Sequence, residues 1–140
     1  MRVKPVTFLI VDDDDVDSQA IERALWEIKI SNPTQRAKDG IEALELLRGG
    51  NGHTRIEGPL MVLLDLNMPR MGGLEFLKTV GEDEALKDLQ IIVLTTSDRD
   101  QDIISAYKYN IYGYVVKSDL RDSLEEVFQE LDAHRTIVAA

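Results

Sequence analysis

The chain has 140 residues, of which 44% are hydrophobic and 30% are charged, as expected for one globular domain. A formal net charge of -10 argues against nucleic acid as a direct partner, because phosphate backbones are bound by clusters of Lys and Arg. The absence of cysteine excludes disulfides, zinc-thiolate sites and thiol nucleophiles. Since neither a targeting signal nor an apolar run of about 20 residues is found, we expect a cytoplasmic protein without a membrane partner.

Five segments have the character of β-strands. The run from Thr7 to Val11 is apolar and β-branched at several positions, which is typical of a strand covered on both faces, and Leu60 to Leu64 repeats this character. The segment from Thr34 to Ala37 is a weaker candidate. The predicted strands are Thr7 to Val11, Thr34 to Ala37, Leu60 to Leu64, Gln90 to Leu94 and Gly113 to Val116.

Segments with helical spacing separate these strands. Apolar residues recur from Val16 to Ile28, and Asn32-Pro33 ends that pattern. Further helices are predicted from Ile41 to Arg48, Leu74 to about Gly81, Gln101 to Tyr109 and Asp119 to about His134. The alternation implies βαβ crossovers. We therefore expect one α/β domain over residues 1–140, built on a doubly wound five-stranded parallel sheet with five helices.

The longest loop of this scheme begins at Gly49-Gly50-Asn51-Gly52 and ends at Gly58-Pro59. Long loops of compact domains are often functional, but a tolerated surface insertion explains the same pattern. Both interpretations stay open from the sequence.

Residues that bind metal or phosphate follow four of the apolar runs. Asp12 and Asp13 end the first run, and Asp65, Thr95 and Lys117 end three others. Because the carboxyl ends of parallel strands lie along one edge of a sheet, these side chains should share one pocket. Three crowded carboxylates repel one another, so they suit a hard divalent cation, Mg²⁺ first of all. The lysine and the hydroxyl suit an anion opposite the metal, which indicates phosphoryl chemistry.

The acidic run from Asp12 to Asp17 allows other interpretations. A calcium-binding EF-hand loop starting at Asp13 would need Gly and Glu where Ser18 and Ala24 stand, so that motif is excluded. A helix N-terminus also favours acids through the helix dipole. We assign the later acids of the run to that role: Asp14, Asp15 and Asp17.

Asp65 is the candidate nucleophile. A lone acid after a strand can simply cap a helix or a turn. The functional interpretation is a carboxylate that accepts a phosphoryl group and forms an aspartyl phosphate. Asn67, two residues later, can offer its backbone carbonyl to the metal.

With these residues in place, the chain resembles the receiver domain of two-component response regulators. This resemblance implies a CheY-like, or flavodoxin-like, fold with the strand order 2-1-3-4-5, and a receiver without an output domain. The resemblance runs from Phe8 to about His134. It rests on these motifs: Leu9-Ile10-Val11-Asp12-Asp13, Leu63-Leu64-Asp65-Leu66-Asn67-Met68-Pro69-Arg70-Met71-Gly72-Gly73, Val93-Leu94-Thr95 and Gly113-Tyr114-Val115-Val116-Lys117.

The resemblance implies a role for each site residue. Asp65 would take the phosphoryl group from a phosphohistidine of a sensor histidine kinase, and Lys117 would pair with the phosphate. Thr95 would move to hydrogen-bond the phosphate, and Tyr114 occupies the aromatic switch position, whose ring turns inward when the threonine moves. The magnesium ligands would be Asp12, Asp13, Asp65 and the carbonyl of Asn67.

The surface that changes in such a switch is formed by the fourth helix, the fifth strand and the fifth helix. All four tyrosines fall in this part of the chain: Tyr107, Tyr109, Tyr112 and Tyr114. Since tyrosine is favoured at interfaces, we expect a surface for a downstream protein target or for a homodimer. Packing of single tyrosines against the sheet is the alternative.

One departure from the family concerns Lys117-Ser118, because the family usually has proline after the lysine, joined by a cis peptide. A cis bond before serine costs on the order of 3–4 kcal/mol, so the loop is either trans and rearranged or strained. This Lys-Ser ending, the extended loop before Asp65 and the stretch Leu94-Thr95-Thr96-Ser97 resemble stand-alone regulators paired with phytochrome-type kinases.

Two rival functions, a phosphatase and an inactive interaction module, fit the sequence less well. A magnesium phosphatase with an Asp nucleophile, of the haloacid dehalogenase type, requires a second acid two residues after the nucleophile, where this chain has Asn67. An interaction module with an inactive receiver fold would usually have lost one of the site residues, and none is lost. The sequence therefore favours a phosphoacceptor that catalyses its own phosphorylation and dephosphorylation rather than an enzyme acting on other substrates.

Overall fold

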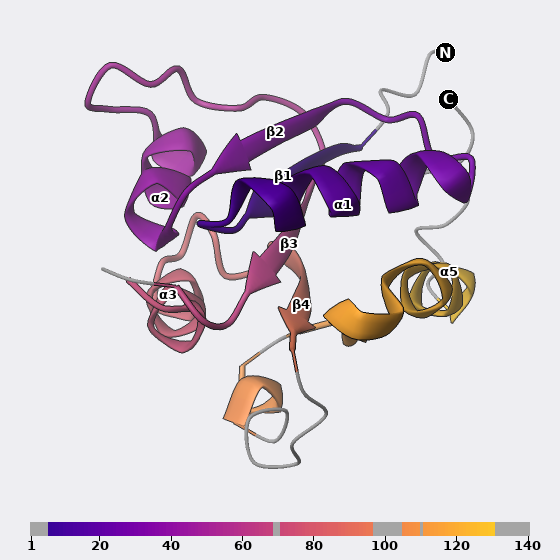
Figure 1. The fold of residues 1–140 in the computed structure, drawn as a ribbon. Coiled ribbons are helices and arrows are strands. Elements are labelled where there is room, and N and C mark those ends of the chain that lie inside the picture. The colour runs from indigo at the N-terminus through magenta and orange to yellow at the C-terminus, as the bar shows by residue number, and fades with distance from the viewer. Residues whose placement is uncertain (1–5, 69–70, 97–104, 110, 131–140) are drawn as a thin grey trace.

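A computed structural model describes residues 6–68, 71–96, 105–109 and 111–130. Its centre is a parallel five-stranded sheet of order β2-β1-β3-β4-β5, of which Figure 1 labels β1 to β4. The strands are β1 (Thr7–Val11), β2 (Thr34–Ala37), β3 (Leu60–Asp65), β4 (Gln90–Thr95) and β5 (Gly113–Val116). The helical elements are α1 (Asp15–Glu27), α2 (Gly40–Arg48), α3 (Gly73–Gly81), the 3-10 helix η1 (Lys117–Asp119) and α5 (Leu120–Glu130).

The predicted fold class and strand order are confirmed. All five predicted strands are present, and β3 and β4 each extend one residue further, to Asp65 and Thr95. Of the helix predicted from Gln101 to Tyr109, residues 105–107 are helical and 101–104 lie outside the described residues. The last helix starts one residue later than predicted, after η1, and its predicted end beyond residue 130 is likewise not described.

Helices cover both faces of the sheet. On one face, Phe8 and Ile10 of β1 pack with Ile21 of α1 and Phe128 of α5, and the rings of Phe8 and Phe128 are 5.7 Å apart. On the other face, Leu9 and Val11 pack against the apolar sides of α2 and α3. Because successive strand residues point to opposite faces, a continuous apolar run such as β1 serves both cores at once. No described helix is long and apolar enough to cross a bilayer.

The strand register aligns the carboxyl ends of β1, β3, β4 and β5. Val11 pairs with Leu64, Asp65 pairs with Leu94, and Thr95 pairs with Val116. The polar residues that end or follow these strands therefore lie along one edge of the sheet.

The long loop between α2 and β3 is an ordered element. Gly50 and His53 form an isolated antiparallel bridge, and Asn51 between them has a positive φ of 48°. Further on, the Ile56 amide donates to the Leu46 carbonyl at 2.9 Å, and the Ile56 side chain is buried.

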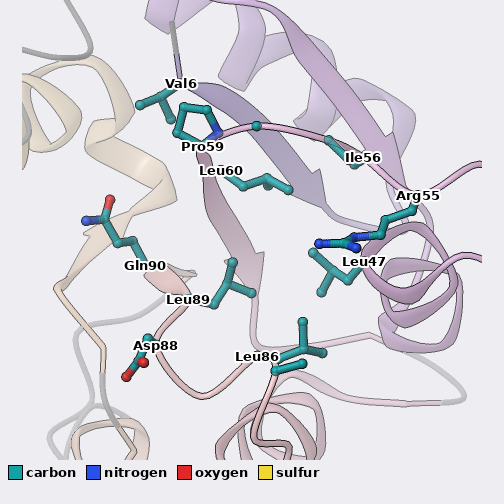
Figure 2. A pocket seen from close by; sticks show the side chains of 12 residues that line it. Val6, Leu47, Arg55, Ile56, Pro59, Leu60, Leu86, Asp88, Leu89 and Gln90 are labelled. Atoms are coloured by element: carbon teal, nitrogen blue, oxygen red, sulfur yellow. The ribbon is translucent and has the colours of Figure 1, made fainter. Parts of the chain in front are cut away.

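This loop lines a cavity of about 460 Å³ at the amino-terminal edge of the sheet (Figure 2). Asp65 lies at the opposite, carboxyl-terminal edge. Leu60, Leu86 and Leu89 line the cavity, and Figure 2 shows the Arg55 side chain pointing from the loop toward it, beside Leu47. The loop thus packs against the domain and lies away from the predicted site.

Candidate functional site

Three carboxylates form the centre of the candidate site. Asp12 and Asp65 are buried, with exposed fractions of 0% and 3%, whereas Asp13 is exposed. One oxygen from each of the three lies within 4.8 Å of the others. The structure therefore brings the predicted acids together at the carboxyl edge of β1 and β3.

Lys117 directly follows β5, and its side chain reaches these carboxylates along the carboxyl edge of the sheet. Its Nζ donates to Asp12 Oδ2 at 2.9 Å and lies 3.4 Å from Asp65 Oδ2. The residue opens η1, and no cis peptide bond occurs among the described residues, so the Lys117-Ser118 bond is trans. Of the two conformations that the sequence left open, the trans one is observed, and it still delivers the ammonium to the acids.

A further carboxylate, Asp17, also binds the lysine. Lys117 Nζ donates to Asp17 Oδ2 at 2.9 Å. The sequence assigns Asp17 to the acidic N-terminus of the first helix, and it does lie in the first turn of α1. Its contact with Lys117 was missed, because the residue stands five positions after Asp12 and no motif marks it. Helical spacing alone could have indicated that its side chain faces the sheet edge.

The pKa values of two groups at the site are both raised, Asp65 by burial and Lys117 by its carboxylate neighbours. Removal from water raises the pKa of Asp65 to about 6, and the Asp12 charge adds to this, while the amide of Asn67 and the Lys117 ammonium oppose it. For Lys117, burial by itself lowers the pKa, but the hydrogen bonds to Asp12 and Asp17 and the charge of Asp65 outweigh it and raise the pKa. The lysine is therefore a fixed positive charge beside a carboxylate that is poorly solvated.

The turn after β1 is held by its own polar groups. The Asp14 side chain caps α1 by accepting from the amides of Val16 and Asp17 at 2.8 and 3.0 Å, which confirms the predicted helix-terminal role of this acid. Arg36 of β2 donates to the Asp12 carbonyl at 3.1 Å and forms an ion pair with Asp15. Within the same turn, the Asp14 amide donates to Asp12 Oδ1 at 2.9 Å and so holds the Asp12 carboxylate.

The turn after β3 depends on a close approach of α3. The Asn67 amide donates to Asp65 Oδ1 at 3.1 Å, which leaves Oδ2 facing Lys117. A Cβ at Gly73 would lie 2.6 Å from Leu66 Cα and 2.8 Å from the Asp65 carbonyl oxygen, so only glycine fits there. Gly72, the residue before it, has no such restriction, since its nearest neighbours would be 3.8 Å away.

The two predicted switch residues lie on β4 and β5. Thr95 is 1% exposed at the end of β4, and Tyr114 is 37% exposed on β5. Tyr107 and Tyr112 are also exposed and line a pocket of about 360 Å³ together with Tyr114. Tyr109 instead packs against the apolar core, which is the alternative that the sequence allowed for single tyrosines.

The donor set at this edge fits a hard divalent cation. Three carboxylates converge, two of them buried, and the cation that now faces two of them is the Lys117 ammonium. Oxygen ligands of this charge are the ones that Mg²⁺ and Mn²⁺ prefer. The residues present are thus suited to hold such an ion.

The fold and this constellation of residues define a receiver domain, and a comparison with protein families agrees. The family model for the response regulator receiver domain matches residues 8–129. This chain belongs to the response regulator receiver family, whose members are signalling proteins that interact with histidine kinases and downstream targets and bind Mg²⁺ or Mn²⁺ in an acidic pocket.

Two curated relatives show the degree of similarity. The probable methanogenesis regulatory protein FilR2 of Methanothrix harundinacea is 34% identical over 88% of this chain and 81% of the relative. The chemotaxis protein CheY-3 of Vibrio cholerae is 33% identical over 91% of this chain and 95% of its own length. The CheY-like assignment made from the sequence is confirmed.

Solved structures give the same result. The bacteriophytochrome response regulator AtBRR superposes with a TM-score of 0.79 at 32% identity, covering 91% of this chain and 92% of its own. The Mn²⁺-bound form of the response regulator Rcp1 superposes with a TM-score of 0.73 at 29% identity, covering 94% and 95%. Regulators associated with phytochromes are therefore among the structural neighbours.

Proposed function

We propose that this protein is a phosphoacceptor whose Asp65 receives a phosphoryl group from the phosphohistidine of a sensor histidine kinase in a Mg²⁺-dependent reaction. The single observation that carries the proposal is the position of Lys117, which bridges buried Asp12 and Asp65 at the carboxyl edge of the sheet. A structural ion pair would need one acid for one lysine. Here an excess of negative charge surrounds a fixed ammonium, which suits a bound cation and a bound phosphoryl group together.

Asp65 would act as the nucleophile. The Asn67 amide and the Lys117 ammonium both favour its ionised form and oppose the rise in pKa that burial causes. One of its oxygens forms the new bond to phosphorus while the P–N bond to the donor imidazole breaks and the imidazole nitrogen keeps the electron pair. Lys117 stands beside Oδ2 and would stabilise the charge on the phosphoryl oxygens.

The metal would be held by Asp12, Asp13, Asp65 and the backbone carbonyl of Asn67, and its charge would neutralise the carboxylates and the incoming phosphoryl oxygens. The Mn²⁺-bound structural neighbour supports a divalent cation in this fold. Hydrolysis of the aspartyl phosphate by the protein itself would return the unphosphorylated state.

Signalling would follow from a shift between two conformations. Thr95, buried beside the site on β4, would move toward the phosphoryl group, and the exposed Tyr114 ring would turn inward. The surface of the fourth helix, β5 and α5, which carries the exposed tyrosines, would then bind a downstream protein or a second copy of the chain.

The kinase partner is proposed to be of the phytochrome type. Support comes from the structural similarity to AtBRR and from the Lys117-Ser118 ending noted in the sequence. Because histidine kinases draw their phosphoryl group from ATP, the proposal places the reaction in the cytoplasm.

Labelling by a small phosphodonor tests the proposal. Wild-type protein incubated with acetyl phosphate and Mg²⁺ should gain one phosphoryl group in intact-mass spectra, and Asp65→Asn should gain none. Asp13→Asn should still be labelled, because it keeps Asp65. It should require more Mg²⁺ for labelling, since it removes one exposed metal ligand. Incorporation by Asp65→Asn equal to that of the wild type would refute the assignment.

A further inference from the structure

Lys117 has three carboxylate neighbours, and they differ in their relation to the metal cluster. Its Nζ lies 2.9 Å from Asp12 Oδ2, 2.9 Å from Asp17 Oδ2 and 3.4 Å from Asp65 Oδ2. Among the described residues, the cluster that could hold a metal contains Asp12, Asp13 and Asp65 but not Asp17. A divalent cation held there would compete with the ammonium for oxygens of Asp12 and Asp65, and would leave Asp17 to the lysine.

We propose that Asp17 is a positioning residue that keeps the Lys117 ammonium at the site when a divalent cation takes the carboxylates of Asp12 and Asp65. This inference rests on the proposed function, because it assigns a role to Asp17 in preparing the same site for the phosphoryl group.

The position of Asp17 is well defined. It lies in the first turn of α1, and its own amide donates to the capping side chain of Asp14 at 3.0 Å. The Asp17 side chain is 42% exposed, whereas that of Lys117 is 13% exposed. A buried ammonium that lost every carboxylate partner would be unfavourable, so a retained partner at the solvent side of the lysine stabilises the metal-loaded state.

Loss of Asp17 should weaken cation binding for two reasons that act in the same direction. In the metal-free protein, the ammonium would settle on Asp12 and Asp65 and compete more strongly with the cation. In the loaded protein, it would lack a carboxylate outside the metal cluster. For a pair that is partly exposed, we expect the dissociation constant of Mg²⁺ to rise about fivefold in Asp17→Asn.

A general electrostatic effect is the competing explanation, since removing any acid near the site weakens cation binding. Asp14→Asn is the matched control. It makes the same chemical change three residues away, on an exposed residue, and asparagine also caps helices well. Screening by solvent should limit its effect to less than about twofold.

A double-mutant cycle with Lys117→Met separates the two explanations. Calorimetric titration of Mg²⁺ is carried out on the wild type, Asp17→Asn, Asp14→Asn, Lys117→Met and the two double variants. The proposal expects the effect of Asp17→Asn to shrink to that of Asp14→Asn once Lys117 is absent. An effect of Asp17→Asn that equals the Asp14→Asn effect with the lysine present, or that persists unchanged without the lysine, would overturn it.

Two further measurements keep the result unambiguous. Far-UV circular dichroism checks that each variant is folded. If Asp17→Asn does not fold, Asp17→Ser replaces it and must show the same coupling to Lys117. Acetyl phosphate labelling of the wild type reports on the proposed function separately. Labelling without coupling in the cycle refutes only the role of Asp17, while coupling without labelling refutes only the phosphoacceptor assignment.

Discussion

Replacing Asp65 by asparagine should make the metal-free protein more stable at neutral pH. Asp65 is 3% exposed, and its removal from water raises its pKa from 3.8 to about 6. A rise of that size corresponds to about 3 kcal/mol of folding free energy once the carboxylate is ionised. Asparagine has nearly the same shape and no charge, so it should recover most of this energy, as is common when a functional residue is replaced.

The pH dependence gives the sign of the effect. The native state holds the Asp65 proton more tightly than the unfolded chain does, so the stability from this group is fully present below about pH 3.8 and is lost as the pH rises to about 6. The difference in unfolding free energy between Asp65→Asn and the wild type should therefore be small near pH 4 and should reach its full value, about 3 kcal/mol at most, above pH 6.

Urea unfolding followed by far-UV circular dichroism, at pH 4 and pH 7.5 with EDTA present, measures this difference. Asp88→Asn is the control, because Asp88 is an exposed acid before β4 at the opposite edge of the sheet, and it should change stability by less than about 0.5 kcal/mol. An Asp65→Asn variant that is no more stable than the wild type at pH 7.5, or whose advantage is as large at pH 4, would contradict the cost of burying the Asp65 carboxylate.

Three further outcomes are expected. Mg²⁺ at about 100 times its dissociation constant should stabilise the wild type by about 2.7 kcal/mol, and chelation should reverse this; an equal gain in Asp65→Asn would contradict the assigned ligands. Gly73→Ala should destabilise the protein by more than about 1 kcal/mol and slow acetyl phosphate labelling, because its Cβ would meet Leu66 and Asp65 backbone atoms at 2.6 and 2.8 Å, whereas Gly72→Ala should be tolerated. Beryllofluoride with Mg²⁺ should raise the sedimenting mass if the tyrosine-bearing surface self-associates, and an unchanged mass would count against that use of the surface.

Much of the fold could be predicted because buried parallel strands have a distinct sequence. The runs over residues 8–11 and 60–64 serve apolar cores on both faces, so they must be apolar throughout, and helical spacing between them implies crossovers. The acids and the lysine could be placed for the same reason. A strand that ends at a known residue delivers the next side chain to the common edge, whatever the details of packing.

Other properties of the site required the tertiary structure. The bond between Asp17 and Lys117 joins residues that are 100 positions apart, and it depends on how α1 lies against the start of η1. Burial sets the raised pKa of Asp65, and burial is a property of all the chain segments around a group rather than of its neighbours in sequence. The long loop before β3 likewise shows its ordered path only where Ile56 packs against the domain.

The amino-acid sequence alone thus determined which residues end the strands and hence which types of group meet at the sheet edge, because hydrophobic periodicity and strand direction are local properties. Only the tertiary structure decided which carboxylates share the Lys117 ammonium, how the Lys117-Ser118 peptide turns and how poorly Asp65 is solvated. These depend on distances of a few ångströms between separate elements. Such distances are set by the packing of whole helices against the sheet.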